Sequence, residues 1–444
     1  MKKTKPEIIF LLVLMFLLVA AAFSFAASPA EPTRDTRTLF GHDVEGLKPV
    51  TLIVPSDANH KTLTDANMMH LAMLIEAESK GQIKLDLHRH GSLYRSNDYP
   101  KVLPIGTIHI AAINKGQLMS REKRFGPWIV GYIWKSPEHL FSVPCSPEWY
   151  EMEEKLAKEK WNMKPMALAP VGNWDYWSKK EVRSMKDLGG KKIWSYGEMS
   201  NAYIAAWGGT PVAKSGSEMY MSYYKGGLDV ISMSILGYLN FKFWECGKYY
   251  VNMPVYPPGS CGIHYVQFYM NRDKWNSLPI AYRKIILDAL DLINAVGIWE
   301  IICEEKMALY RLINEHKVVD CGIATEHPEE YEKIRKAAVE AGKKYVFDRG
   351  VTQAQWDEAQ NILKKYADPK HTSRYSWFFK LAWAEADRRL AQVKKDLAAG
   401  KTWNEAYDAY HPKHRYDWTV EKIKKEWMAV PRVKMDWNEA TRLQ

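Results

Sequence analysis

Hydrophobic residues alternate between strand and helix spacing along most of the chain, most clearly over residues 187–229. The pattern there predicts, in order, a strand ending at Trp194, a helix closed by Gly208 and Gly209, a strand at 210–212, a helix over 217–227 and a strand that begins at Leu228. Glycines commonly follow the last turn of a helix. Strands that alternate with helices in this way are typical of a parallel sheet, so this stretch predicts an α/β domain.

The rest of the chain continues the pattern. The further predicted elements are strands at 51–54, 83–87 and 108–113, a helix capped by Thr64, and an amphipathic helix over 148–161. A helical pattern then runs from Leu278 to about His316, interrupted only by Gly297. With a rise of about 1.5 Å per residue, this helix would be roughly 55 Å long. We therefore expect a single helix that underlies two lobes and braces a hinge between them.

The first 30 residues have the pattern of an export signal. Three lysines precede an apolar run at 8–22, and the small residues of a cleavage site follow it, ending at Ala26. The run is shorter than the roughly 20 residues that a membrane span needs. We expect a signal peptide at 1–26, cleaved after Ala26, and a mature protein that is soluble in the periplasm. No cysteine lies near Ala26, so a lipoprotein is not expected.

Composition adds aromatic surface to this picture. The chain has 444 residues, which is enough for two domains, and it contains 18 Trp and 25 Tyr. Its formal charge is +10, and loss of residues 1–26 removes three Lys and one Glu, which leaves about +8. This charge is spread along the chain, so it favours anionic partners only diffusely and does not indicate nucleic-acid binding.

The five cysteines have no CxxC spacing, and their number is odd. Cys246 and Cys261 flank a turn rich in Pro and Gly, which would bring neighbouring strands together. They are the candidate disulfide pair in an exported protein.

No catalytic motif stands out. His88 and His90 would share one face of a strand, but a third metal ligand at a defined spacing is missing. The sequence Ser-Gly-Ser at 215–217 lacks the GxSxG pattern of a nucleophile elbow. We therefore expect no enzymatic activity, no metal site and no cofactor.

Six segments of the chain follow the order found in one known family. They are GQIKLDLHRHGSLY, PIGTIHIAAINKG, SMKDLGGKKIW, GGTPV, SEMYMSYYKGGLD and a long helix after LPIAYRKI. In this order and spacing the chain resembles the solute-binding subunits of TRAP transporters, of the C4-dicarboxylate-binding (DctP) type, over about residues 48–350.

The resemblance implies an α/β fold, that of a two-lobed, type II-like periplasmic binding protein. Lobe 1 is expected at about 48–150 with part of 230–280, and lobe 2 at about 165–235 with part of 250–345. The resemblance also implies that a solute is captured by closure of the cleft and delivered to a sodium-coupled membrane permease. A periplasmic ligand sensor or structural protein with the same fold, but without a permease, is the alternative.

The chain departs from this family at positions that usually bind the ligand. Trp194 stands where the resemblance places a ligand-binding arginine, and Trp174 falls where many members have a second one. Met233 takes the place of an asparagine, and Gly216 that of an aromatic residue. Arginine offers a bidentate donor for carboxylate, whereas indole offers one N–H and a large π face. Simple dicarboxylates are therefore expected to bind poorly.

These exchanges predict a different ligand. Two facing indoles would favour a flat aromatic ring by stacking, or a quaternary ammonium by cation–π attraction. Arg95 and Asn114 are the remaining polar candidates, and Tyr196 and Tyr238 are expected as walls. Because Arg95 would pair with one carboxylate, an aromatic or bulky monocarboxylate is the preferred ligand. The alternatives are that the indoles only pack the lobes, that Arg95 is a solvated charge, and that Asn114 caps a turn.

Residues 351–444 lie beyond the region of resemblance. Helices are predicted at 353–366, 376–399 and 420–428, and the segment contains seven tryptophans. So much aromatic surface argues against disorder. The helices either wrap around the two lobes or present aromatic side chains to a partner, which includes a second copy in a homodimer.

Overall fold

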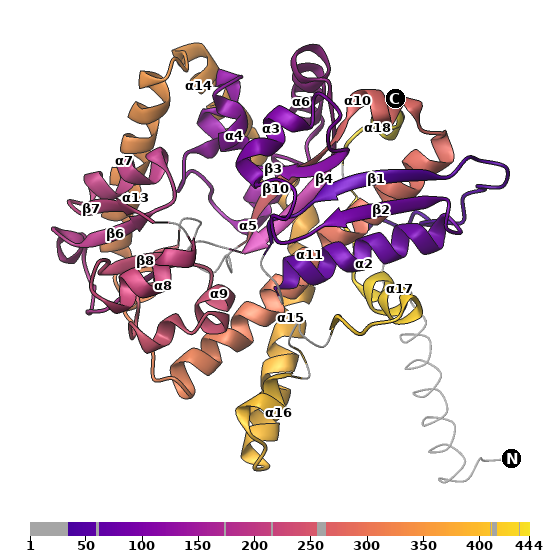
Figure 1. The fold of residues 1–444 in the computed structure, drawn as a ribbon. Helices are drawn as coiled ribbons and strands as arrows, with labels where there is room; N and C mark the ends of the chain where they lie inside the picture. Colours follow the sequence, from indigo (N-terminus) through magenta and orange to yellow (C-terminus); the bar gives the residue numbers. More distant parts are fainter. Residues whose placement is uncertain are drawn as a thin grey trace, which may run out of the picture.

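The computed structural model describes residues 34–444 except 59–61, 173–174, 215, 255–262, 409, 411–414 and 435. Two α/β lobes are joined by a long helix, and a set of C-terminal helices packs beside it (Figure 1). This architecture confirms the predicted fold class. The predicted signal peptide lies outside the described residues and stays a prediction.

The first lobe contains two small sheets, on the right in Figure 1. Strands β1 (Val50–Pro55) and β2 (Ile83–His88) pair in parallel, and β3 (Ile110–Ile113), β10 (Ile263–Asn271) and β4 (Met163–Gly172) form an antiparallel sheet in that order. Its helices are α2 (Leu63–Glu78), η1 (Ser96–Asp98), α3 (Tyr99–Val102), α4 (Lys115–Met119), η2 (Lys123–Phe125), η3 (Pro127–Ile129), α5 (Pro137–Ser142), α6 (Pro147–Trp161) and α10 (Arg272–Ser277).

Two details of this lobe differ from the sequence prediction. The cap of α2 is Thr62, whose Oγ1 accepts a hydrogen bond from Asp65 N at 3.3 Å, and Thr64 lies inside the first turn. An N-cap side chain reaches the third helical residue, which selects Thr62 over Thr64. Strand β4 belongs to this lobe as far as Gly172 because it pairs with β10 over its length, whereas the sequence placed residues from 165 in the second lobe.

The second lobe is built on a six-stranded sheet of order β11-β9-β5-β8-β6-β7. Its strands are β5 (Asp175–Ser178), β6 (Lys192–Ser195), β7 (Thr210–Ala213), β8 (Val230–Met233), β9 (Tyr249–Tyr250) and β11 (Val319–Asp320). Its helices are η4 (Met185–Leu188), α7 (Glu198–Ala206), α8 (Gly216–Tyr224), α9 (Ile235–Asn240), η5 (Phe243–Glu245), α12 (Ile323–Glu326) and α13 (Pro328–Asp348). Because β6 pairs in parallel with both β7 and β8, the predicted parallel arrangement is confirmed.

The long helix α11 (Ile280–Asn314) has 35 residues and contacts α2 and β4 in the first lobe and α9 in the second. Most of its positions are buried, and the buried positions include acidic residues such as Asp291, Glu300 and Glu305. The helix passes through Gly297 without a break. At Gly297 the absence of a side chain lets the helix approach β4 closely. A Cβ at Gly297 would lie 2.4 Å from Pro170 Cγ. The prediction of one helix that bridges the lobes is confirmed.

The C-terminal extension wraps around the lobes. Its helices are α14 (Gln353–Tyr366), α15 (Pro369–Ala398), α16 (Trp403–Asp408), α17 (Val420–Ala429) and α18 (Glu439–Leu443). Helix α15 runs beside α11 (Figure 1), and α17 packs on α2. The Trp427 and Trp437 side chains are buried at 1% and 5% exposure. The aromatic residues of this segment thus contribute to the core, which favours the structural interpretation of the extension.

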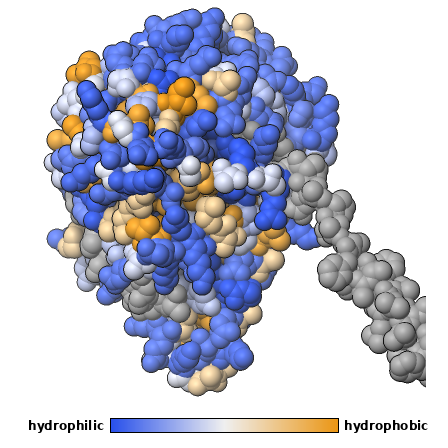
Figure 2. Space-filling model, turned by 90° about the vertical axis from the view of Figure 1, so that its right-hand side faces the viewer, coloured by the Kyte–Doolittle hydropathy of each residue, from blue (hydrophilic) through white to orange (hydrophobic). Residues whose placement is uncertain are grey.

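The face shown in Figure 2 is largely hydrophilic, with small scattered groups of hydrophobic residues. A broad apolar patch would mark an interface between copies. On this face no such patch is seen among the described residues, and a homodimer through the extension stays a prediction. In the part of the chain that the structure describes, no helix combines the length and apolar character that a membrane crossing requires.

Candidate ligand-binding cleft

A cavity of about 520 Å³ lies between the lobes. The first lobe contributes residues 96–97 and 114–119, the second lobe contributes 196–199, and the segment 128–134 closes one side. The aromatic side chains in its lining are Trp128, Trp134, Tyr196, Tyr265 and Tyr345. A volume of this size suits a small organic molecule.

A second cavity of about 220 Å³ adjoins the first, since Ser96, Asn114 and Gln117 line both. It lies where β1, β3 and β4 end in the first lobe, and Val171 of β4 forms part of its lining. Ligands of open α/β sheets commonly bind beyond strand ends. The two cavities together form the candidate ligand-binding cleft.

Lys115 is the cation in the described lining of the larger cavity. Its ammonium forms an ion pair with the buried Glu153 and donates a hydrogen bond to the Tyr269 hydroxyl at 2.8 Å. Trp149 Nε1 also donates to Glu153, at 3.0 Å. Burial lowers the pKa of Lys115, and Glu153 opposes this effect. The lysine therefore holds the first lobe together and is already engaged when a ligand arrives.

Asn114 combines two of the roles considered from the sequence. Its Oδ1 accepts a hydrogen bond from Gly116 N at 2.7 Å and caps α4, while Gln117 Oε1 accepts from Asn114 N at 3.0 Å. Both side chains also line the two cavities. The capping box fixes these amides at the cavity wall. Gln117 was missed because nothing in the local sequence distinguishes it from a surface glutamine.

Trp194 lies in the core of the second lobe, with only 7% of its surface exposed. Its Nε1 donates a hydrogen bond to Lys214 O at 3.0 Å, and its ring centroid is 6.1 Å from that of Tyr196. The described lining of the two cavities includes Tyr196 but not Trp194. Trp174 lies outside the described residues, so the facing pair of indoles stays a prediction.

The remaining second-lobe candidates are spread over different environments. Met233 ends β8 opposite Asp175 and is half-buried. Gly216 begins α8, and its place in the ligand site stays a prediction. Tyr238 is fully buried, stacks on Trp177 with centroids 3.8 Å apart and donates to Gly247 O at 2.9 Å. The expectation that Tyr238 forms a cleft wall is therefore wrong, because its ring belongs to the lobe core.

Arg95 is an exposed residue just before η1. Its guanidinium folds back over Gly91, where an added Cβ would lie 2.7 Å from Arg95 Nη1. The two residues that follow, Ser96 and Asn97, line the larger cavity. Arg95 is thus at the rim of the cleft, and its role as a carboxylate partner stays a prediction.

The paired histidines and the candidate disulfide of the sequence have the following surroundings. Within the described part of the chain, no cluster of three or more metal-ligating side chains occurs. His90 lies 3.2 Å from Asp65, which Arg89 also binds through two hydrogen bonds of 2.7 and 2.6 Å. Cys246 is half-buried with a free thiol, and Cys261 lies outside the described residues, so their pairing stays a prediction.

Two buried carboxylates at the junction of the lobes were also missed. Asp175 opens β5 and Glu305 lies on α11, and each is 2% exposed. Burial raises the pKa of Asp175 to about 7, against a hydrogen bond from Tyr250. Burial, reinforced by Asp175 and Glu304, raises the pKa of Glu305 well above its usual range. Neither residue belongs to a recognisable motif, and only the packing of α11 on the hinge strands brings them together.

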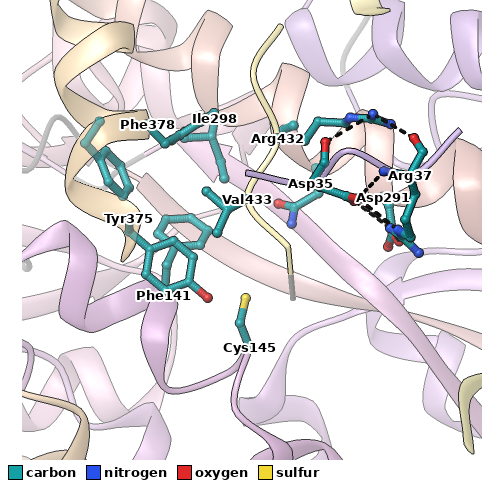
Figure 3. Close-up of a pocket in the computed structure, with 13 residues that line it drawn as sticks. Asp35, Arg37, Phe141, Cys145, Asp291, Ile298, Tyr375, Phe378, Arg432 and Val433 are labelled. Atoms are coloured by element: carbon teal, nitrogen blue, oxygen red, sulfur yellow. Dashed lines mark hydrogen bonds and ion pairs between the residues drawn. The ribbon is translucent and has the colours of Figure 1, made fainter. Parts of the chain in front are cut away.

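A further cavity lies away from the cleft, between the N-terminal segment, α11 and α15 (Figure 3). Its volume of about 30 Å³ has room for about one water molecule. On its polar side, Arg37 donates to Asp35 at 2.7 Å and to Asp291 at 3.0 Å. This cavity is a packing defect beside an ion-pair cluster and is too small for an organic solute.

Comparison with known proteins adds the following findings. The family model described as bacterial extracellular solute-binding protein, family 7, matches residues 56–348. Among curated proteins, the uncharacterized protein YiiZ of Salmonella typhimurium is 23% identical over 199 residues, which is 43% of this chain. That match covers 59% of the relative, or about three fifths of its length.

Several solved structures share the fold. A TRAP periplasmic solute-binding protein of Ochrobactrum anthropi, with its C-terminus bound in the ligand-binding pocket, is 20% identical with a TM-score of 0.62, over 73% of this chain and 98% of that one. The Bordetella pertussis receptor DctP7, which binds pyroglutamic acid, is 15% identical with a TM-score of 0.60, over 72% and 100%. A Desulfovibrio salexigens protein with bound orotic acid is 16% identical with a TM-score of 0.58, over 73% and 99%. At these identities the likeness concerns the fold.

Proposed function

We infer that this chain, which belongs to family 7 of the bacterial extracellular solute-binding proteins, is a TRAP-type solute receptor that works in the periplasm. It captures a small organic solute and delivers it to a membrane permease. The observation that carries this proposal is the cavity of about 520 Å³ between two α/β lobes. No catalytic step is part of the proposal.

Capture occurs by closure of the lobes. Each wall of the larger cavity includes residues that directly follow a strand, 114–119 after β3 in the first lobe and 196–199 after β6 in the second. A solute that contacts both walls stabilises the closed form over the open one, since a ligand shifts an equilibrium by its differential affinity for the two states. Helix α11 contacts both lobes and limits the motion to a hinge.

The proposed ligand is an aromatic or bulky monocarboxylate. The aromatic lining of the larger cavity supports a flat or apolar ligand body. The engagement of Lys115 with Glu153 leaves Arg95 at the rim as the proposed carboxylate partner. Orotic acid, bound by the Desulfovibrio salexigens protein, is a flat ring with one carboxylate. Trp174, Trp194, Met233 and Gly216 are kept as proposed parts of the second-lobe wall.

Thermal-shift measurements on the purified protein test this proposal. The panel contains aromatic acids, aliphatic monocarboxylates and dicarboxylates, and a ligand at about 100 times its Kd stabilises the fold by about 2.7 kcal/mol. We expect aromatic acids to give the largest shift, and Tyr196→Ala to weaken binding roughly tenfold through loss of a ring contact. Tyr224→Ala, which removes a 62% exposed ring outside the described cavity lining, is the matched control. If succinate gave the largest thermal shift of the panel, both in the native protein and in Tyr196→Ala, the proposed ligand class would be contradicted.

A further inference from the structure

The side chain of Glu305 is enclosed at the junction of the lobes. It is 2% exposed, and neither Oε1 nor Oε2 has a hydrogen-bond partner among the described residues. The charged groups that face it are both acidic, Asp175 from β5 and Glu304 from α11 itself. Leaving a carboxylate buried and unpaired is costly, so this arrangement needs an explanation beyond packing.

Glu305 lies behind Gly172, next to the hinge edge of the cleft, and is outside the described lining of both cavities. A Cβ on Gly172 would be 3.1 Å from Glu305 Oε1 and 3.1 Å from Ser234 Cβ. Gly172 and Ser234 are half-buried, and Gly172 follows Val171, which lines the smaller cavity. Because residue 172 is glycine, it places no side chain between the carboxylate and this edge. Helix α11 is held there by the close packing of Gly297 on Pro170.

The acidic character extends along this edge. Asp175, the first residue of β5, pairs across the sheet with Met233, one residue before Ser234. Tyr250 donates a hydrogen bond to Asp175, and Asp320 is the other carboxylate near it. A ligand carboxylate would be repelled at this point, whereas a cation would be attracted by two neighbouring carboxylates.

We propose that Glu305 receives a protonated amine of the solute at the hinge edge of the cleft, so that the receptor takes small amines or amino acids with an aromatic or apolar body. This inference rests on the proposed function of the cleft. The two free oxygens of Glu305 lack N–H donors, which a primary ammonium supplies and a quaternary ammonium does not. An amino acid also satisfies the proposed carboxylate contact at the rim.

Titration calorimetry on the purified protein tests the amine. The probes are phenylalanine, phenylethylamine, its N-trimethyl derivative and phenylpropanoate, which share one ring and differ in charged group. We expect the two primary amines to bind most tightly, and Glu305→Gln to weaken them by roughly 30-fold or more while it leaves phenylpropanoate unchanged. Glu315→Gln, at the half-buried C-cap of α11 where the glutamate pairs with Arg311, is the matched control and should alter none of the four.

The outcomes separate the two proposals. If phenylpropanoate binds and the amines do not, or if Glu305→Gln leaves amine binding unchanged, the amine inference is overturned and the receptor proposal remains. Binding of neither amine by the native protein also overturns it. The receptor proposal fails only if the wider panel of acids also gives no binding. An unchanged melting temperature of Glu305→Gln in the absence of ligand shows that lost binding is not lost folding.

Discussion

Glu300 and Glu305 lie five positions apart on α11, and both are buried, but their surroundings have opposite charge. Glu300 is 8% exposed and accepts hydrogen bonds from Arg389 at 2.7 and 3.1 Å, with Arg415 as a further ion-pair partner. Glu305 is 2% exposed, and within the part of the chain that the structure describes its carboxylate has no hydrogen-bond partner. Burial alone would raise the pKa of Glu300, but the two arginines outweigh it and hold the pKa at about 2. For Glu305, burial and acidic neighbours raise the pKa.

The difference shows how one buried helix serves two purposes. The partners of Glu300 come from the C-terminal extension, Arg389 on α15 and Arg415 just before α17. A buried ion pair of this kind fixes how the extension docks, and removal of one partner leaves a buried charge uncompensated. The surroundings of Glu305 come from the hinge strands and provide no compensation, which is the condition that an incoming cation would relieve.

The largest effect is expected for Glu300→Gln. The change removes the charge between Arg389 and Arg415, so it should lower the free energy of unfolding by about 3–5 kcal/mol. Urea denaturation followed by circular dichroism measures this loss. A loss below about 1 kcal/mol would mean that the extension is held by its aromatic packing alone.

The pH dependence should be the next largest effect. The pKa of Asp175 is raised from 3.8 to about 7, so the folded state binds its proton more tightly than the unfolded state. The contribution of Asp175 to the free energy of unfolding is therefore fully present below about pH 4. It is lost as the pH rises to about 7, and the loss is roughly 4 kcal/mol at most. Tyr250, Asp320 and Glu305 face the same carboxylate.

Urea denaturation at several pH values, compared between the native protein and Asp175→Asn, measures this contribution. The variant should show a flatter profile between pH 4 and 7. If the two proteins showed parallel profiles, the pKa of Asp175 would not be raised by burial in the folded state.

Glu305→Gln should have a smaller effect of the opposite sign to Glu300→Gln. Burial and the acidic neighbours raise the pKa of Glu305, so its charged form is already disfavoured and an amide should change the stability by less than about 1 kcal/mol. At higher pH the native carboxyl ionises without a partner, and the variant should become the more stable protein. Thermal unfolding at pH 7 and pH 9 tests this, and a clear loss of stability at both values would identify a structural partner for Glu305.

The smallest effect is expected for Lys306→Ala, one residue further along α11. Its ammonium pairs with Asp387, but the two side chains are 27% and 65% exposed. Exposed ion pairs contribute about 0–1 kcal/mol because solvent and side-chain entropy offset the attraction. If Lys306→Ala lowered the free energy of unfolding by more than Glu300→Gln does, the proposed difference between buried and exposed ion pairs on this helix would be wrong.

Much of the fold could be predicted from the sequence, because it depends on local patterns. The 187–229 stretch gave the parallel strands around β6, and the apolar run after Leu278 gave α11. The N-cap was misplaced from Thr62 to Thr64 because both residues are threonines before the same apolar run. The site was less accessible: Asn114 and Tyr196 were found and line the cavity, whereas Gln117 and Trp128 were not expected there.

The sequence by itself determined the order of the elements, since this depends on residue type and spacing, whereas the departure from the arginines that the resemblance implies stays a prediction. Only the tertiary structure decided that Tyr238 is in the core, that Lys115 is already paired, and that Glu305 is buried with no hydrogen-bond partner among the residues described. These properties depend on which distant segments come together, and periodicity carries no information about that. A glutamate on a helix is ordinarily a surface residue, and Glu305 differs because α11 passes beneath the strands that join the lobes.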